Sequence, residues 1–424
     1  MYLRCCLWIS PVGDTHMKQF NVPVIYRSPL ISAIKKKRRD ADKMKKDFTP
    51  TTLDLGTVRF HLARHFGFCY GVENAIDIAF RTIESNPGKR IFLLSEMIHN
   101  PQVNADLLAR GVQFLQDTLG NPLIPLDSLT ADDVVLIPAF GTTLAMEATL
   151  RERGIPVENY NTTCPFVEKV WNRSEQIAQK EYTIIIHGKP SHEETRATFS
   201  HATANGPAMV IKDMTEAIIL GEFITGVRSM HEFATTFPKR YSDGFDPAVH
   251  LNRIGVVNQT TMLASDTQGI ADYLRQQMEI RYGSETIRDH FADTRDTLCY
   301  ATNDNQSAVY GLLNTHADLA IVVGGYNSSN TSHLVELCEE KLPTYFINEA
   351  SQLISRDLIR HYDLHQKIER ETTSFLPSKS TIDILITSGA SCPDALVEAV
   401  MERLCELTDA KPLATRLQEW EEAN

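Results

Sequence analysis

Three cysteines stand where a thiolate could do chemistry. Cys69, Cys164 and Cys299 are about 95 and 135 residues apart, and each comes just before a stretch with helical periodicity. The partial positive charge of a helix N-terminus favours thiolate over thiol. A single cysteine of this kind is more often a small buried hydrophobe. Three of them in the same kind of corner predict one shared centre, with each thiol supplied by a separate α/β unit.

The type of metal follows from the number and spacing of these thiols. Structural zinc sites use four ligands, generally in close pairs, and these three cysteines have neither feature. Three thiolates suit a [4Fe–4S] cluster whose fourth iron stays open. An open iron is a Lewis acid that can take a hydroxyl group, and the cluster can pass single electrons. The other cysteines stand in poorer positions: Cys5, Cys6, Cys338, Cys392 and Cys405.

Short apolar runs alternate with helical patterns from about residue 58 to 407. The expected strands are 58–62, 91–94, 134–137, 182–186, 209–211, 254–257, 319–323, 344–347 and 382–386. The expected helices are 73–84, 101–110, 142–153, 166–179, 193–200, 265–281, 304–315, 331–340 and 394–407. Unbroken Val/Ile/Leu strands alternating with helices predict an α/β fold with parallel sheets covered on both faces. Residues 225–252 read as an irregular insertion.

Five strand-to-helix corners are rich in imidazole, hydroxyl and amide groups. Ligands of such sheets bind beyond the carboxyl ends of the strands, where these corners lie. The corners are 95–101, 187–195, 258–261, 324–333 and 387–393. Helix capping is the simplest account of any one of them. Together they predict a cradle for a phosphate-type anion. Neither a P-loop nor a dinucleotide-binding glycine motif is present in the sequence.

The charge of the chain is unevenly divided. Residues 1–60 carry twelve Lys/Arg and five Asp/Glu, whereas the whole chain of 424 residues has a net charge of −12. The acidic body argues against nucleic acid as the main partner. The basic run 35–46 is interpreted as a solvated extension, with a targeting or nucleic-acid patch as the alternative. No run reaches the length of a membrane span, and scattered cysteines without a secretory signal predict a reducing compartment.

Seven motifs in register carry a family resemblance. They are Gly67-Phe68-Cys69-Tyr70-Gly71-Val72, Thr162-Thr163-Cys164-Pro165, Ser191-His192-Glu193-Glu194-Thr195, Asn258-Gln259-Thr260-Thr261, Cys299-Tyr300-Ala301-Thr302, Asn327-Ser328-Ser329-Asn330 and Ser388-Gly389-Ala390-Ser391. The chain resembles the 4-hydroxy-3-methylbut-2-enyl diphosphate reductases, LytB-type iron–sulfur enzymes of the methylerythritol phosphate route to isoprenoids. The likeness runs from about residue 59 to 407. The His-Glu-Glu-Thr form and the insertion are similar to the longer plant and cyanobacterial branch.

This resemblance implies a fold and an activity. Three pseudo-equivalent α/β domains would surround a central [4Fe–4S] cluster and enclose a diphosphate substrate. The expected ranges are a basic N-terminal extension at 1–58, domains at 59–163, 164–298 and 299–407, and a tail at 408–424. The activity would be reductive dehydroxylation of 4-hydroxy-3-methylbut-2-enyl diphosphate to isopentenyl and dimethylallyl diphosphate.

The resemblance also implies roles for particular residues. The cluster ligands would be Cys69, Cys164 and Cys299. The diphosphate would be held by His99, His192, Ser328, Ser329, Asn330 and Ser391. Glu194 would be the proton source, and Thr260 with Asn330 would complete the network near the substrate hydroxyl. Phe140 replaces a diphosphate-binding histidine of the short bacterial enzymes, so one charged donor fewer is expected.

Two other functions remain open from the sequence. An iron–sulfur hydro-lyase acting on a phosphorylated substrate would need no reductant, and a diphosphate sensor or scaffold would need no catalytic acid. For the reductase, the resemblance implies a ferredoxin or flavodoxin as electron donor. The sequence gives neither oligomeric state nor product ratio. A cytoplasmic location is expected, or a plastid if residues 1–58 contain a transit peptide.

Overall fold

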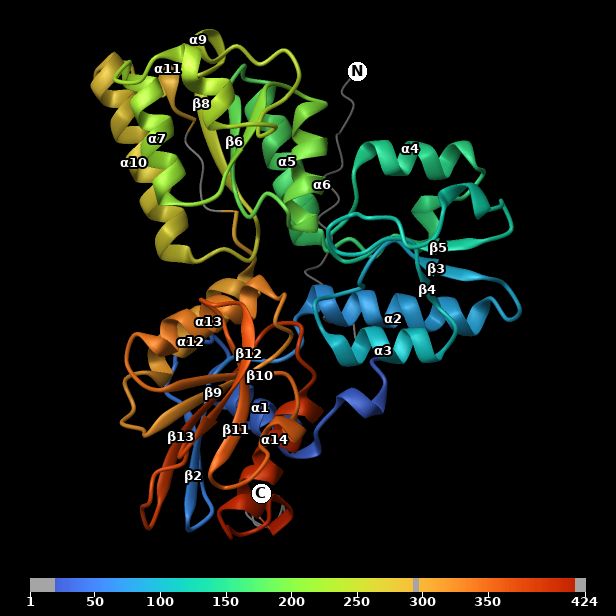
Figure 1. Cartoon of the computed structure of the whole chain (residues 1–424), viewed down its shortest axis with the longest axis vertical. Helices are drawn as coiled ribbons and strands as arrows, with labels where there is room; N and C mark the ends of the chain where they lie inside the picture. The colour runs from blue at the N-terminus through green and yellow to red at the C-terminus, as the bar shows by residue number, and fades with distance from the viewer. Residues whose placement is uncertain (1–19, 293–296, 416–424) are drawn as a thin grey trace, which may run out of the picture.

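The chain forms three sheet-centred modules (Figure 1). The computed structural model describes residues 20–292 and 297–415. Its strands are β1 Thr51–Asp54, β2 Val58–Leu62, β3 Ile91–Leu93, β4 Gln113–Phe114, β5 Val134–Leu136, β6 Thr183–His187, β7 Ala208–Ile211, β8 Ile254–Asn258, β9 Leu319–Val323, β10 Thr344–Ile347, β11 Leu358–Asp363, β12 Ile368–Thr373 and β13 Ile382–Ser388. All nine expected strands are among them, with ends shifted by at most two residues.

All nine expected helices are also present, with ends shifted by at most four residues. The helices of the structure are α1 Pro29–Ala41, α2 Tyr70–Ser85, α3 Pro101–Ala109, α4 Leu144–Glu152, α5 Pro165–Ala178, α6 Glu193–Thr203, α7 Met214–Thr225, α8 Phe233–Thr236, α9 Pro247–His250, α10 Ala264–Tyr282, α11 Ile287–His290, α12 Tyr300–Leu312, α13 Ser329–Glu339 and α14 Asp394–Leu407. Of these, α1, α7 and the short α8, α9 and α11 were not expected. None of the helices in the described ranges has the length and apolar character of a membrane span.

The three sheets repeat one strand arrangement. The orders are β4-β3-β5, β7-β6-β8 and β1-β2-β13-β9-β10-β11-β12. In each module one strand (β3, β6 or β9) lies in the centre, with parallel partners on both sides. In Figure 1 the modules occupy the right, the upper left and the bottom of the view. Because parallel strands end at one edge, each module presents its strand-to-helix corners together.

The seven-stranded sheet differs from the expected parallel sheet. β1 pairs antiparallel with β2, and β10, β11 and β12 form an antiparallel series. The expected α/β fold with parallel-type sheets is confirmed for the centre of this sheet, whereas the antiparallel strands at its two ends were not expected. β12 is almost entirely exposed and carries charged residues, as suits an edge strand that must not pair with other chains. Such a strand lacks the unbroken apolar run on which the prediction relied.

The polypeptide crosses between modules at its beginning. β2 pairs in parallel with β13, over a register from Val58↔Ile382 to Leu62↔Ile386. It therefore belongs to the sheet of the C-terminal module, although it falls at the start of the range expected for the first domain. The chain leaves this sheet directly into the corner that contains Cys69, so the first thiol is positioned by the third module's sheet.

The insertion at 225–252 packs onto the second module. It contains α8 and α9, and its aromatic rings pack together and against Phe223 of α7; these rings are Phe233, Phe237, Tyr241 and Phe245. Tyr241 forms an antiparallel bridge with Met209 of β7. The insertion thus covers the outer edge of this three-stranded sheet.

The N-terminal segment is a structural part of the molecule. Helix α1 begins after Ser28, whose hydroxyl accepts a hydrogen bond from Ile31 N–H at 2.9 Å. Leu30, Ile31 and Ile34 are buried in the core around the seven-stranded sheet. The interpretation of the basic run as a solvated extension is therefore wrong for α1, because one face of this helix packs inward while its cations point outward.

Replacing Ile31 by Ala should destabilise the protein by about 2–5 kcal/mol, because it removes a fully buried side chain from the core. Chemical denaturation followed by circular dichroism would measure this change. Lys36→Ala on the exposed face of the same helix is the control, with an expected effect within about 0.5 kcal/mol. Equal, small effects of both changes would show that α1 contributes no stability.

Candidate active site

The three predicted cysteines occupy the same position in three helices. Cys69, Cys164 and Cys299 are the N-cap residues of α2, α5 and α12. All three line one cavity. At Cys299 the sulfur accepts a hydrogen bond from Thr302 N–H at 3.3 Å. The structure therefore brings together the thiols that the sequence placed about 95 and 135 residues apart.

Gly71 allows two of these thiols to come close. A Cβ at this position would lie 2.4 Å from the sulfur of Cys164, which is closer than any real contact. Gly71 stands in the first turn of α2, two residues after Cys69, so the absence of a side chain lets the second module's thiol approach the first module's helix. The need for glycine at this point is steric, since its backbone is not in the left-handed region.

The electrostatics of the thiols is dominated by burial. Burial raises the pKa of Cys69, and the neighbouring Cys299 and Cys164 raise it further. Burial also raises the pKa of Cys164, to about 12, while N–H groups of the α5 N-terminus act in the opposite direction. The helix termini alone therefore do not produce the thiolates expected from the sequence. Three thiolates in this cavity need a cationic partner, and soft sulfur donors suit iron.

Burial and partner residues define the state of two predicted diphosphate ligands, His99 and His192. His99 Nε2 lies 2.8 Å from Glu193 Oε2, a carboxylate that also accepts a hydrogen bond from Ser95. His192 caps α6, where its Nδ1 accepts the Glu194 N–H at 3.1 Å. Burial lowers the pKa of His192 well below its usual value. A neutral His192 with Nδ1 engaged in this way carries its proton on Nε2.

The predicted serine and asparagine ligands form hydrogen bonds that use only part of their capacity to donate and accept. Ser328 caps α13, because its hydroxyl oxygen accepts a hydrogen bond from Thr331 N–H at 3.3 Å. Helix capping, the simplest explanation of this corner from the sequence, is therefore confirmed for Ser328. Asn330 Oδ1 accepts the N–H of Ala390 at 2.9 Å. Ser391 Oγ donates to the carbonyl of His99 at 3.1 Å. Ser329 Oγ accepts from Gln259 Nε2 at 3.3 Å and retains its own proton as a donor.

A buried carboxyl group faces the same cavity. Glu194 Oε1 accepts the Thr260 N–H at 2.5 Å, and Oε2 lies 2.9 Å from the Thr260 hydroxyl. Burial raises the pKa of Glu194 to about 7, although both Thr260 hydrogen bonds act to lower it. The raised pKa of Glu194 thus has a cause in the protein itself.

A hydrogen-bond path links this carboxyl group to one of the thiols. The Thr302 hydroxyl donates to the Thr260 carbonyl at 2.9 Å and lies 3.1 Å from the Cys299 sulfur. Thr302 and Glu193 are positioning residues that the sequence analysis did not single out. The role of Thr302 could have been predicted from its position three residues after Cys299, because an N-cap side chain accepts a hydrogen bond from the backbone N–H of that residue.

The eleven residues predicted for the site all line the same cavity. They are Cys69, His99, Cys164, His192, Glu194, Thr260, Cys299, Ser328, Ser329, Asn330 and Ser391. Phe140 lines it too, with its ring centroid 4.3 Å from that of His99 and 5.4 Å from that of His192. At this position, where the short bacterial enzymes have a histidine, an aromatic ring packs against His99 and His192. In the described residues, no three His, Cys, Asp or Glu side chains are arranged to hold a single metal ion.

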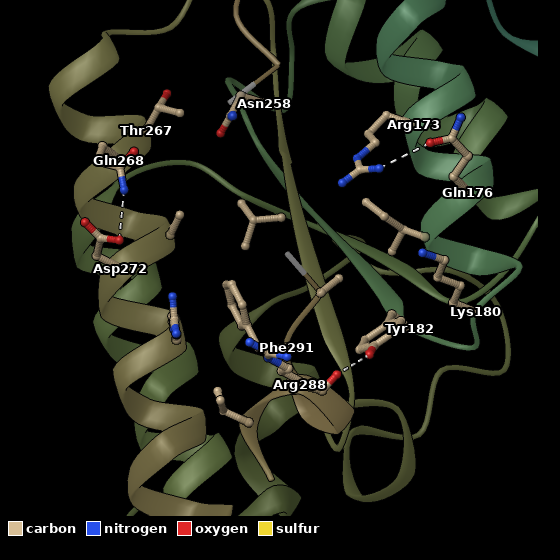
Figure 2. A pocket seen from close by; sticks show the side chains of 16 residues that line it. Arg173, Gln176, Lys180, Tyr182, Asn258, Thr267, Gln268, Asp272, Arg288 and Phe291 are labelled. Atoms are coloured by element: carbon tan, nitrogen blue, oxygen red, sulfur yellow. Dashed lines mark hydrogen bonds between the residues drawn. The ribbon is translucent and has the colours of Figure 1, made fainter. Parts of the chain in front are cut away.

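A separate cavity of about 810 Å³ lies in the second module between α5 and α10 (Figure 2). Its wall includes Arg173, Lys180, Arg275 and Arg288. None of the predicted site residues in the described ranges lines it. This cavity is therefore distinct from the one where the candidate chemistry gathers.

Three sheet modules whose helix N-caps deliver one thiol each define an α/β protein with a central thiolate site. This chain belongs to the LytB protein family, since the model of that family matches residues 60–405. Curated relatives named 4-hydroxy-3-methylbut-2-enyl diphosphate reductase include one from a Synechococcus strain, 40% identical over 85% of this chain and 87% of its own length. Another, from Gloeobacter violaceus, is 39% identical over 84% of each chain.

Two solved structures support the fold. One is the structure of (E)-4-hydroxy-3-methyl-but-2-enyl diphosphate reductase, the terminal enzyme of the non-mevalonate pathway, with a TM-score of 0.50 and 24% identity over 81% of this chain and 98% of that one. The other is the corresponding reductase from Plasmodium falciparum, with a TM-score of 0.59 and 20% identity over 82% and 87%.

Gly71→Ala should prevent the first two thiols from serving one centre, because the new methyl group would collide with the Cys164 sulfur. We expect the iron and sulfide content of anaerobically purified protein to fall to less than half of the wild-type value, which should be about four of each per chain. Gly269→Ala in α10 is the control, since its Cβ would meet only an ordinary contact at 3.6 Å. Full iron content in Gly71→Ala would contradict the shared centre.

Proposed function

We propose that this protein reduces 4-hydroxy-3-methylbut-2-enyl diphosphate to isopentenyl and dimethylallyl diphosphate. The observation that carries the proposal is one cavity that contains three helix-capping thiols, a carboxyl group with a pKa near 7 and a cluster of neutral hydrogen-bond donors. The family membership and the names of the curated relatives support the same activity.

The three thiols would hold a [4Fe–4S] cluster through Cys69, Cys164 and Cys299, leaving one iron open. Such a cluster supplies a Lewis acid for an alcohol oxygen and a store for single electrons. The geometry fits this group because each sulfur comes from the start of a different helix, so separate irons can be reached from separate modules.

The diphosphate would lie against the histidine and serine side of the cavity. His192 offers an Nε2 proton, and the hydroxyls of Ser328 and Ser329 can each donate to phosphate oxygen. The contact of His99 Nε2 with Glu193 fixes the orientation of this imidazole, which would lie beside the diphosphate. Phe140 adds no charge, and the site would therefore rely on neutral donors more than on cations.

Glu194 would deliver the proton that lets the hydroxyl group leave as water. A carboxyl group with a pKa of about 7 is substantially protonated at neutral pH, which suits a general acid. When Oε2 carries the proton it can donate to the Thr260 hydroxyl, whose own proton then turns toward the substrate. The overall change consumes two electrons and two protons, breaks the C–O bond, forms a C–H bond and releases water.

Water must be kept away from such a reaction, because the second proton has to arrive only at the chosen carbon. Glu194 and Thr260 are almost completely buried, as are Ser328, Ser329 and Asn330. The cavity thus meets this requirement with its own side chains.

Glu194→Gln should reduce turnover by about 10²- to 10⁴-fold, since an amide cannot act as the acid. Activity would be measured anaerobically with dithionite-reduced methyl viologen, and diphosphate affinity and iron content should be retained. Glu152→Gln, at an exposed carboxylate on α4, should have wild-type activity. Full turnover by Glu194→Gln would remove Glu194 from the catalytic role.

The pH dependence of kcat/KM should report the same group. With a Glu194 pKa of about 7, kcat/KM should fall about tenfold per pH unit above neutrality as the acid loses its proton. Thr260→Val removes a hydrogen bond that stabilises the charged carboxylate, so the falling limb should move to higher pH. If the falling limb of the kcat/KM profile stays at the same pH in Thr260→Val, a group other than Glu194 is responsible for it.

A hydro-lyase remains the alternative activity, and reductant dependence separates the two. Product formation without any reductant would favour the hydro-lyase, whereas consumption of two electrons per product favours the reductase. A ferredoxin or flavodoxin as natural donor stays a prediction. So do the cytoplasmic or plastid location and the domain ranges drawn from the sequence.

A further inference from the structure

Two of the aromatic residues that follow the three cysteines, Phe166 and Tyr300, form an aromatic cap beside the thiols. Each cysteine is followed within two residues by an aromatic ring, that of Tyr70, Phe166 or Tyr300. The rings of Phe166 and Tyr300 are 5.0 Å apart, and the Tyr300 hydroxyl accepts the N–H of Tyr70 at 3.0 Å. Tyr300 is 37% exposed. The cap therefore joins the buried sulfur of Cys299 to the molecular surface through a single adjacent residue.

A strongly basic segment lies directly beside this cap. Residues 35–47 contain eight Lys/Arg and three Asp, in a chain whose net charge is −12. Lys45 Nζ lies 5.5 Å from the centre of the Tyr300 ring and 3.5 Å from Asp304 of α12. A concentration of positive charge thus lies next to the exposed ring that follows Cys299.

The segment is held in this position by its own contacts. Arg38 binds the side chain of Asp47 at 3.2 Å and the carbonyl of Thr49 at 2.8 Å, which closes the loop after α1. Phe48 packs tightly on α12, where a Cβ at Gly311 would lie 2.2 Å from its carbonyl oxygen. The basic surface is therefore a built feature of the fold.

Several of its side chains have nothing to neutralise them. The cations that are exposed and have no ion pair within the described ranges are Lys36, Arg39, Lys43 and Lys46. Between them Met44 is 72% exposed. An exposed apolar side chain and an exposed aromatic ring, with cations around them, are typical of a small interface with a polar rim.

We propose that this basic docking face, formed by residues 36–47 and Tyr300, binds an acidic one-electron carrier protein and receives electrons beside Cys299. The inference rests on the proposed reductase function and adds the site at which the electrons enter. Two carrier molecules would each lose one electron per turnover, and these two electrons with two protons convert the alcohol into the deoxygenated product and water.

Charge and size favour this occupant over a polyanion. The rest of the chain is acidic, so a nucleic acid or an anionic membrane would be repelled outside this small face. Redox encounters need little area, below about 1,200 Å², and gain their rate from complementary charge. A carrier must also release after each electron, which suits a contact of charged side chains that is screened by salt.

The test compares two double variants with the same charge change. Lys43→Glu with Lys46→Glu alters the docking face, and Lys89→Glu with Lys239→Glu alters exposed lysines elsewhere. The probe is a reduced acidic plant-type ferredoxin, whose oxidation by the anaerobic holoenzyme is followed by stopped flow without substrate. We expect the second-order rate to fall 10- to 100-fold in the docking-face variant at low salt, and less than twofold in the control.

Two further measurements separate this inference from the proposed function. Turnover with reduced methyl viologen, a small cation that needs no docking, should stay within twofold of wild type in both variants. The salt dependence of the ferredoxin reaction should become flatter only in the docking-face variant. Equal ferredoxin rates in both variants would overturn the docking face. Absence of product with viologen in the wild type would instead overturn the reductase function and leave the ferredoxin result standing.

Discussion

The structure depends on bringing three thiols from distant parts of the chain into one buried cavity. Each is placed by the same device, a cysteine at the N-cap of a helix. Burial makes the free thiolates unfavourable, as the raised pKa values of Cys69 and Cys164 show. The modules are thus arranged so that the site gains its full stability only with a cation among the sulfurs.

Two adjacent glutamates show how the fold divides chemistry between neighbours. Glu193 points to His99 and Ser95, where it accepts hydrogen bonds and orients an imidazole. Glu194 points to Thr260 and is held in a protonatable state by burial. The two side chains point in different directions because consecutive residues at an α-helix N-terminus face different neighbours. One carboxyl group thus contacts a histidine and a serine, and the other contacts a threonine.

The N-terminal segment connects stability with electrostatics. Its apolar residues Leu30, Ile31 and Ile34 are part of the core under the seven-stranded sheet. The same helix carries the cations outward, and Lys35 binds Asp394 of α14 at 2.6 Å. An acidic chain thereby keeps one basic area in a fixed place next to Tyr300, where charge can guide an approaching protein.

Among the described residues, the sequence by itself determined nine of the thirteen strands, nine of the fourteen helices and a set of side chains that line one cavity. Unbroken apolar runs such as Leu319–Val323 are buried on both sides and are readable from local pattern alone. The tertiary structure alone decided the rest, because it depends on residues far apart in the chain. The exposed strand β12 has no apolar signal, and α1 is buried only through a sheet that includes β13, some 350 residues later. Likewise, the pKa of Glu194 is set by desolvation, a sum over everything that surrounds the carboxyl group, which no local pattern contains.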